Sequence, residues 1–312
     1  MSPPTGLALG IDIGGTKILA IAVDPRTATV VSVIRRETPS GSAALAAEVV
    51  EVATELISTS GATSIGLGIP GLVNRDGILR YGPNVPGIVD LDLVPTLRAR
   101  TGLVVRATND GACAALAEHR LGAGVGSSEM LFVAQGTGIA GGHIINGRLA
   151  TGAYGFAGEP GHMAVQLGGP MCACGRTGCW EAVASGAGLV NLAYEVVDDY
   201  PAATWLRRSD LRGEDVMAAF ESGDPAAEEV LDRFVFWVAR GLGSLISLLD
   251  PELVVLGGGL SRSNGNFLHR INDAVEGFVI GAGHRPSVPI VAAQFGEHAG
   301  AIGAALFGIE PV

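Results

Sequence analysis

Residues 7–24 read LALGIDIGGTKILAIAVD, and residues 131–149 read LFVAQGTGIAGGHIINGRL. Each stretch has the pattern of a buried strand, a glycine turn and a second strand. A pattern that recurs after about 120 residues indicates a structural repeat. The two stretches therefore predict an α/β chain with two related halves, each of which offers one glycine turn to a ligand.

The rest of the chain alternates between helical and strand patterns. Helices are expected at 43–58, 95–101, 112–121, about 184–200, 225–249 and about 299–307, and strands at 30–35, 64–70, 103–107, 253–259 and 289–293. The DLRGEDV stretch at 210–216 is expected to be a surface connection with no functional role. We expect a small N-terminal α/β domain at 1–108, with the C-terminal helix at 299–312 packed back on it, and a larger α/β domain at 109–298.

The composition excludes several classes of protein. The chain has 312 residues and a net charge of −11 without a basic run, which argues against a nucleic-acid partner. The most apolar stretch, Phe234 to Leu249, is interrupted by Arg240, so no membrane-spanning segment is expected. The N-terminal sequence MSPPTGLALGID lacks the basic region and cleavage site of a secretory signal. A cytoplasmic location is therefore expected.

Three of the four cysteines, Cys172, Cys174 and Cys179, lie within eight positions, beginning ten residues after His162. Three thiolates and one imidazole are the ligand set of a closed, four-coordinate zinc site, and such close spacing favours a metal over disulfides. The alternatives are a reduced loop without metal, or a purely structural zinc. Glutamates 159 and 181 flank the segment, and a structural zinc needs neither of them. The segment is therefore predicted to hold carboxylates toward a ligand with several hydroxyls.

Two glycine turns are candidate phosphate sites. In Asp12-Ile-Gly14-Gly15-Thr16-Lys17, backbone N–H groups, a hydroxyl and an ammonium group can reach phosphate oxygens, and the aspartate can hold Mg²⁺ through water. An ordinary hairpin with a Gly-Gly turn is the alternative. Gly136-Thr137-Gly138 occupies the matching place in the second half, which favours a phosphate clamp. Gly257-Gly258-Gly259 follows another strand and could pass beneath a base or ribose.

Asn109 and Asp110 lie where a predicted strand passes into a predicted helix. The carboxyl end of a strand is where α/β proteins place ligands, and an aspartate there can take a proton from an attacking hydroxyl. Aspartate is also a good helix N-cap. Taken alone, the sequence around Asp110 leaves both roles open.

Taken in order, these motifs resemble the ROK family of bacterial sugar kinases and repressors, which has the ribonuclease-H-like fold of actin and hexokinase. The resemblance covers nearly the whole chain. It rests on DIGGTK (12–17), NDGA (109–112), GTGIAGG (136–142), EPGH (159–162), CACGRTGCWE (172–181), GGGLS (257–261) and GEHAGAIGAAL (296–306). It implies a two-domain α/β fold with a ligand cleft between the domains, and a homodimer.

The resemblance also implies a reaction, in which ATP bound with Mg²⁺ phosphorylates the 6-hydroxyl of a hexose. Asp110 would be the base that acts on this hydroxyl. The implied sugar contacts are Asn84, Asn109, Asp110, Glu159, His162 and Glu181. The implied zinc ligands are the second nitrogen of His162 with Cys172, Cys174 and Cys179. The implied nucleotide contacts are Asp12, Gly14, Gly15, Thr16, Lys17, Gly136, Thr137, Gly138, Gly257, Gly258 and Gly259.

Four positions depart from the family pattern: Ile88, Ala112, Ala140 and Pro160. None of them removes a catalytic group, but they bear on which sugar is preferred. Glucose is the expected substrate and glucose 6-phosphate the expected product. Fructose, mannose, allose and an N-acetylated hexosamine remain alternatives, and polyphosphate remains an alternative donor.

Two functions from other classes are disfavoured. A repressor of this family would need a DNA-binding domain of roughly 60–80 residues before the first phosphate motif. Only eleven residues precede Asp12, and the chain is acidic. A sugar-binding protein without catalysis would not need Asp110 and both phosphate turns.

Overall fold

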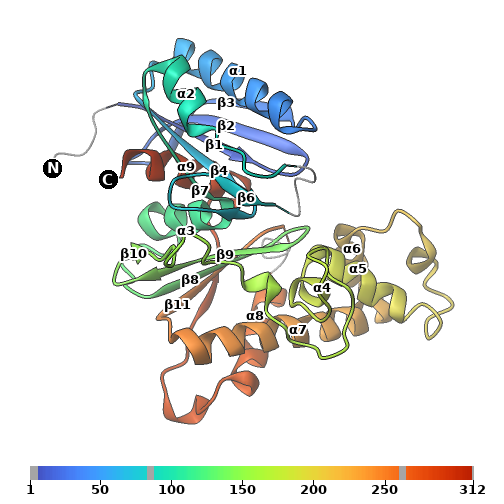
Figure 1. Ribbon diagram of the computed structural model, residues 1–312. Helices are drawn as coiled ribbons and strands as arrows, with labels where there is room; N and C mark the ends of the chain where they lie inside the picture. The colour runs from blue at the N-terminus through green and yellow to red at the C-terminus, as the bar shows by residue number, and fades with distance from the viewer. Residues whose placement is uncertain (1–5, 83–87, 260–264, 311–312) are drawn as a thin grey trace. The chain divides into compact units, whose positions relative to one another are not determined.

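The computed structural model describes residues 6–82, 88–259 and 265–310 (Figure 1). Its strands are β1 (Ala8–Ile13), β2 (Lys17–Asp24), β3 (Thr29–Glu37), β4 (Ser64–Ile69), β5 (Leu72–Val73), β6 (Leu79–Tyr81), β7 (Val104–Asn109), β8 (Met130–Gln135), β9 (Ile139–Ile145), β10 (Arg148–Leu149), β11 (Leu253–Gly257) and β12 (Ile290–Ala292). Its α-helices are α1 (Ser42–Ser60), α2 (Val94–Thr101), α3 (Asp110–Leu121), α4 (Glu181–Ala184), α5 (Gly186–Glu195), α6 (Gly213–Glu221), α7 (Pro225–Leu249), α8 (Gly265–Val275) and α9 (Ala299–Ile309).

The first sheet has five strands in the order β3-β2-β1-β4-β7. Its first three strands in sequence are antiparallel neighbours, whereas β4 and β7 run parallel to β1. Helices α1 and α2 lie on one face of this sheet, and α9 lies on the other (Figure 1). Asp12 pairs with Gly68 of β4, and Ile69 of β4 pairs with Asn109 of β7. Asp12 and Asp110 therefore lie at the carboxyl ends of the parallel strands β1 and β7, where ligands bind in sheets of this kind.

The second sheet repeats this connectivity, with the order β10-β9-β8-β11-β12. It too begins with three consecutive strands and continues with two later ones, and it is mixed, since β9 and β10 are antiparallel while β11 and β12 are parallel. The recurrence of strand, glycine turn and strand in the sequence therefore corresponds to a recurrence in three dimensions. The predicted α/β fold with two related halves is confirmed.

The chain forms two compact units. The first unit contains the residues up to Phe132, residues 141–158 and the residues from Gln294 onward, and the second contains residues 133–140 and 159–293. In the first unit α9 packs directly on β1 and β4. Gly10 and Gly66 make this possible, because a Cβ at either position would collide with a backbone carbonyl of α9. The domain boundary predicted at residue 109 and the ligand cleft stay predictions.

Two helical predictions in the second unit had different outcomes. The helix predicted at 225–249 is α7, which Asp224 caps by accepting the N–H groups of Ala226 and Ala227. The helix predicted at about 184–200 is α5, but it is shorter than predicted: it begins at Gly186, because the chain is extended at Ser185, and it ends at Glu195. The Ser185 hydroxyl caps α5 by accepting the N–H of Gly188 at 3.2 Å.

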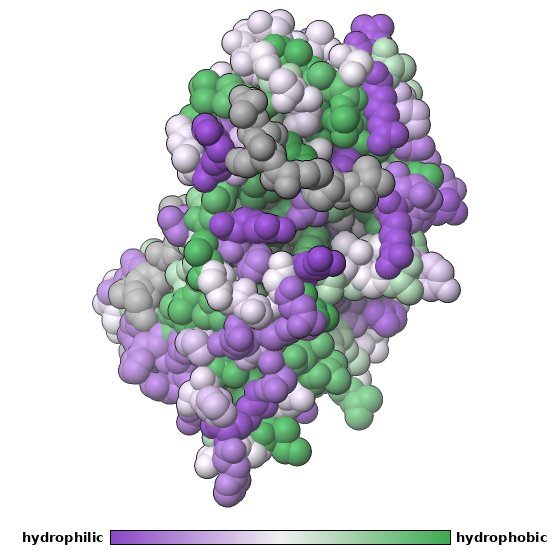
Figure 2. Space-filling model, turned by 90° about the vertical axis from the view of Figure 1, so that its left-hand side faces the viewer, coloured by the Kyte–Doolittle hydropathy of each residue, from purple (hydrophilic) through white to green (hydrophobic). Residues whose placement is uncertain are grey.

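Hydrophilic and hydrophobic residues are interspersed over the face of the molecule that Figure 2 shows. Among the described helices, none is both long enough and apolar enough to span a membrane. The longest, α7, buries its apolar side chains within the second unit, among them Phe234, Val238 and Leu242.

Candidate active site

Two carboxylates, Asp12 and Asp110, lie close together in the first unit. Asp12 stands near the carboxyl end of β1, and Asp110 begins α3 directly after β7. A Cβ added at Gly68, on the intervening strand β4, would lie 3.4 Å both from Asp12 Oδ1 and from the Cα atom of Asp110. The glycine therefore leaves room for the two acidic residues to approach each other across the sheet.

Burial raises the pKa of both carboxyl groups. The pKa of Asp12 rises to about 7, because burial disfavours its charge and the Asp110 carboxylate repels it, while Lys17 opposes the rise. Burial also raises the pKa of Asp110, against the hydrogen bond that its Oδ1 accepts from the N–H of Gly111 at 2.8 Å. Shifted carboxyl groups of this kind cluster at sites of acid–base chemistry and cation binding.

The raised pKa of Asp12 predicts a pH-dependent stability. The folded protein holds this proton more tightly than the unfolded chain, so stability falls as the pH rises from about 4 to about 7 and is level above that. The shift from 3.8 to about 7 corresponds to at most about 4 kcal/mol. We therefore expect Asp12→Asn to raise the melting temperature of the nucleotide-free protein at pH 8 and to leave it unchanged at acidic pH, as calorimetry would measure.

Asp24→Asn is the control variant, for which the expected change in melting temperature at pH 8 has the opposite sign. Asp24 pairs with Arg26 at 2.7 Å, and this interaction lowers the pKa of Asp24 to about 2. Its removal is expected to lower the melting temperature slightly at pH 8. An Asp12→Asn protein that also melts lower than the wild type at pH 8 would contradict the role assigned to burial at Asp12.

Asn109, rather than Asp110, is the N-cap of α3. Its side-chain oxygen accepts the N–H of Ala112 at 3.0 Å, and its amide donates to the carbonyl of Gly71 at 3.1 Å. The alternative in which Asp110 serves as the helix cap is therefore wrong. Because a neighbour fills that role, the Asp110 carboxylate is left for chemistry at the end of the strand.

The first glycine turn, residues 12–17, joins β1 to β2 as a hairpin. The N–H of Gly14 donates to the carbonyl of Lys17 at 2.8 Å, and the residues from Gly15 to Lys17 are exposed. The Lys17 ammonium forms an ion pair with Glu297 at 3.1 Å, and Arg35 contacts the same carboxylate at 2.8 Å. The turn is thus a hairpin with an exposed hydroxyl and ammonium group, which is compatible with phosphate binding.

His162, Cys172, Cys174 and Cys179 come together in the second unit, with all four ligand atoms within 4.8 Å of one another. Cys174 Sγ lies 3.7 Å from Cys179 Sγ, and Cys172 Sγ lies 3.7 Å from His162 Nδ1. In a tetrahedron with Zn–S bonds of about 2.3 Å, two sulfur atoms are about 3.8 Å apart. The cluster therefore has the dimensions as well as the donor set of a structural zinc site.

The EPGH segment starts a short 3₁₀ turn, Pro160–His162. Proline suits the first position of such a turn, because its missing N–H would have no partner there and its fixed φ favours the turn. This position accounts for Pro160, one of the departures from the family pattern. Arg176 of the cysteine loop donates to the carbonyl of His162 at 3.0 Å, so the loop and the turn support each other.

Glu181 follows the cysteine loop at the start of α4. Its carboxylate accepts a hydrogen bond from the N–H of Ile139 at 2.9 Å, directly after the second glycine turn. Within that turn the N–H of Gly136 donates to the carbonyl of Gly138 at 2.9 Å. A carboxylate that the resemblance assigns to the sugar therefore lies beside a turn that it assigns to phosphate.

A pocket of about 650 Å³ lies in the second unit beside the second glycine turn. Three predicted nucleotide contacts line it: Gly136, Thr137 and Gly259. Gly258 has a φ of 100°, and a Cβ there would collide with the backbone of Gln135, which also lines the pocket. The glycine run after β11 thus lets two strand ends approach each other at this pocket.

Helices α5 and α6 supply the other walls. The stretch at 210–216, expected to have no functional role, contributes Arg212 and Glu214 to the pocket lining, and α6 adds Met217 and Glu221. The stretch was also expected to carry helix-capping residues, and Arg212 is indeed the N-cap of α6; the absence of a functional role stays a prediction. The sequence carries no signal for these walls, because Met217 and Val190 have the helical spacing of ordinary core residues.

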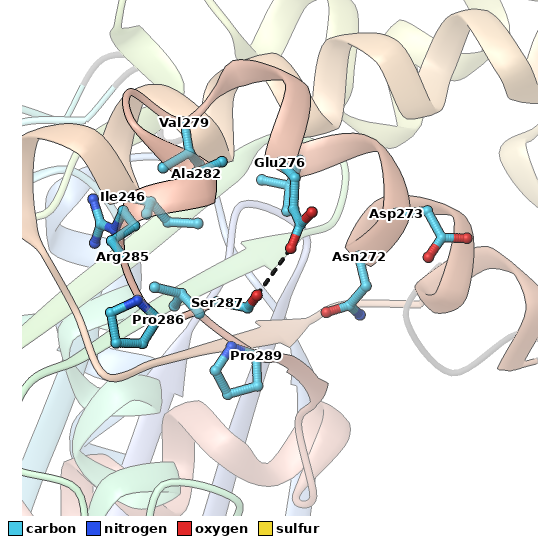
Figure 3. Close-up of a pocket in the computed structure, with 12 residues that line it drawn as sticks. Ile246, Asn272, Asp273, Glu276, Val279, Ala282, Arg285, Pro286, Ser287 and Pro289 are labelled. Atoms are coloured by element: carbon cyan, nitrogen blue, oxygen red, sulfur yellow. Dashed lines mark hydrogen bonds between the residues drawn. The ribbon is translucent and has the colours of Figure 1, made fainter.

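A second pocket in the same unit, of about 660 Å³, contains none of the predicted residues (Figure 3). Its polar groups already interact with protein atoms. Ser287 donates to Glu276 at 2.9 Å, Asn272 bonds to the backbone of Ile290 in both directions, and Arg285 pairs with Asp250. We assign no chemistry to this pocket.

The predicted site residues fall into two groups. The first unit holds Asp12, Gly14, Gly15, Thr16, Lys17, Asn109 and Asp110, and the second holds Gly136, Thr137, Gly138, Glu159, His162, Cys172, Cys174, Cys179, Glu181, Gly257, Gly258 and Gly259. Asn84 lies outside the described residues.

Comparisons with known proteins place these motifs in a wider context. The profile of the ROK family matches residues 8–310. The chain is 34% identical to the glucokinase of Streptomyces coelicolor over 98% of each chain, and 32% identical to the N-acetylmannosamine kinase of Escherichia fergusonii over 96% of this chain and 97% of that one. The crystal structure of a ROK family glucokinase from Streptomyces griseus, in complex with glucose and AMPPNP, superimposes with a TM-score of 0.87 at 33% identity, covering 97% of this chain and 99% of that one.

Proposed function

Because the chain belongs to the ROK family, we propose that it is a hexose kinase that transfers the γ-phosphate of ATP to the 6-hydroxyl of a sugar, with glucose as the preferred substrate. Glucokinases and an N-acetylmannosamine kinase are among its relatives of similar identity. Membership of the family therefore supports sugar kinase activity, but it does not by itself select one sugar as the substrate.

The observation that carries the proposal is the position of Asp110. Its neighbour caps the helix, so the carboxylate is left at the end of β7, and burial raises its pKa toward the operating range of a general base. Asp110 accepts the proton of the sugar 6-hydroxyl while the hydroxyl oxygen bonds to the γ-phosphorus. The bond between that phosphorus and the bridging oxygen breaks, and ADP leaves. Such a transfer depends on positioning and charge neutralisation more than on covalent chemistry.

The pocket beside the second glycine turn supports a nucleotide as the donor. Val190 and Met217 offer apolar surface for a flat base, and Glu214 and Glu221 offer acceptors for amino or hydroxyl groups. Polyphosphate has no base that could contact these side chains. These features favour ATP over polyphosphate.

Two metals belong to the proposal. Zinc would be held by His162, Cys172, Cys174 and Cys179, whose spacing fits it, and it supplies structure in a site without an open position. Asp12 would hold magnesium, which would supply charge neutralisation for the phosphates when bound. A cytoplasmic location suits the three thiolates because thiols are kept reduced in the cytoplasm. The family resemblance supports a homodimer.

A panel of hexoses tests the function. Initial rates with ATP and Mg²⁺ would be measured for glucose, mannose, fructose, allose, N-acetylglucosamine and N-acetylmannosamine, with polyphosphate as a second donor. We expect glucose and ATP to give the highest kcat/KM and a 6-phosphate product. A higher kcat/KM for N-acetylmannosamine would overturn the choice of sugar, and no turnover with any pair would overturn the kinase.

A further inference from the structure

The Glu181 carboxylate contacts two motifs at once. Its Oε2 accepts the N–H of Ile139 at 2.9 Å, and its Oε1 lies 3.5 Å from the Sγ atom of Cys172. The contact with the glycine turn is close, since a Cβ at Gly138 would collide with Oε2. One side chain therefore links the cysteine cluster to the turn that the proposed function assigns to phosphate.

Further contacts constrain the same turn. A Cβ at Gly161, in the EPGH segment, would lie 2.5 Å from the carbonyl oxygen of Ile139. Downstream of Glu181, the N–H of Gly186 donates to the carbonyl of Gly136 at 2.8 Å, and the amide of Gln135 donates to the carbonyl of Ala184 at 2.8 Å. The backbone on both sides of the turn is thus hydrogen-bonded to residues 181–186, which follow the cysteine loop.

We propose that Glu181 is a positioning residue for the second phosphate turn, in addition to the sugar contact that the resemblance implies, and this inference rests on the proposed function. The two carboxylate oxygens have separate tasks. Oε2 holds the N–H of Ile139, and this is the bond that a side chain makes directly to the backbone at the end of the glycine-rich turn, where Gly136 and Thr137 are exposed. A metal-bound Cys172 is a thiolate and donates no proton, so Oε1 is then left for a sugar hydroxyl.

The consequence is a link between the cysteine loop and the phosphate donor. If Glu181 served the sugar alone, changes at this position would weaken sugar binding and leave nucleotide binding as it was. If it also orients the turn, they weaken the binding of nucleotide even when no sugar is present.

Two conservative variants distinguish the effect of the length of the Glu181 side chain from the effect of its charge. Glu181→Gln keeps the length of the side chain, and its amide oxygen can still accept the N–H of Ile139. Glu181→Asp keeps the charge but is shorter by one methylene, so its carboxylate withdraws from that N–H. Loss of a hydrogen bond to a charged acceptor weakens an interaction by about an order of magnitude, so we expect Glu181→Asp to bind nucleotide about 10-fold more weakly. Glu181→Gln should stay within about 3-fold of the wild type, because it loses charge assistance and not the bond.

The measurement is calorimetric titration of each zinc-loaded protein with AMPPNP and Mg²⁺ in the absence of sugar, and separately with glucose in the absence of nucleotide. Zinc content is determined for every sample, and amide hydrogen exchange of residues 136–140 reports on the turn directly. Faster exchange is expected in Glu181→Asp and not in Glu181→Gln. Glu159→Ala, which removes the other carboxylate flanking the loop, is expected to weaken glucose binding alone.

The outcomes distinguish the positioning role of Glu181 from the proposed kinase function. Equal nucleotide affinity in Glu181→Asp and the wild type would overturn the positioning role and leave the proposed kinase intact. Equal weakening by Glu159→Ala would also overturn it, because the effect would then belong to the whole loop. Failure of the wild type to bind AMPPNP would instead refute the proposed nucleotide donor.

Discussion

Asp110→Asn is expected to lower kcat by about 10²–10⁴-fold, the usual contribution of a general base, while glucose affinity stays within a few-fold of the wild type. Asparagine has the same shape and can still accept the N–H of Gly111, but it cannot take the hydroxyl proton. Burial raises the pKa of Asp110, so the folded protein disfavours the charged form and should tolerate a neutral side chain. The checks are steady-state rates, glucose titration and the melting temperature at pH 8.

Two features make this prediction specific. Asn109 caps α3, so loss of the Asp110 carboxylate should not shorten the helix, and an unchanged or higher melting temperature is expected. The variant Asp24→Asn, at the opposite end of β2 from Lys17, should keep full turnover. Near-normal turnover of Asp110→Asn would mean that another group is the base.

Loss of the metal is expected to have the second large effect. We expect about one zinc per chain, none in Cys179→Ala, and a fall in turnover of about 100-fold or more in that variant. Structural zinc binds small zinc peptides with about 10–16 kcal/mol of apparent free energy at pH 7. The loop between His162 and Cys179 contains little regular secondary structure beyond its first turn, so it depends on this contribution. Metal analysis, turnover and limited proteolysis of the loop are the measurements.

Cys113→Ala is the matched control for the metal prediction. Cys113 is the fourth cysteine, is fully buried, and is absent from the cluster. Its replacement should leave zinc content unchanged and cost about 1 kcal/mol of stability, as the loss of a small buried group does. A wild-type protein that is active without metal would refute the zinc assignment.

The sequence was most informative where chemistry is local. Three cysteines within eight positions of each other can meet in almost any loop, so the ligand set was predictable from spacing, and the structure brings the four ligands together. The helix at 225–249 was predictable because Asp224 and Pro225 mark its start. The repeat of strand, glycine turn and strand was sufficient to predict two sheets of related topology.

Prediction was less accurate at the ends of helices and at surfaces that separate segments form together. The helix expected at 184–200 begins only after Ser185, whose hydroxyl caps it, and it ends at Glu195, because periodicity alone does not fix the ends of a helix. Met217 and Val190 line a pocket although they have core-like spacing, since the pattern of one helix does not show whether its apolar face meets protein or a ligand. The cap of α3 could not be assigned either, because adjacent asparagine and aspartate residues are both good caps.

By itself, then, the sequence determined the family, the repeated α/β halves and the residues able to bind zinc, since these depend on patterns and short spacings. The tertiary structure alone decided that burial raises the pKa of Asp12 and Asp110, and that Glu181 contacts Ile139, 42 positions earlier in the chain. Burial and long-range hydrogen bonds are set by how separate segments pack together. No local pattern carries that information.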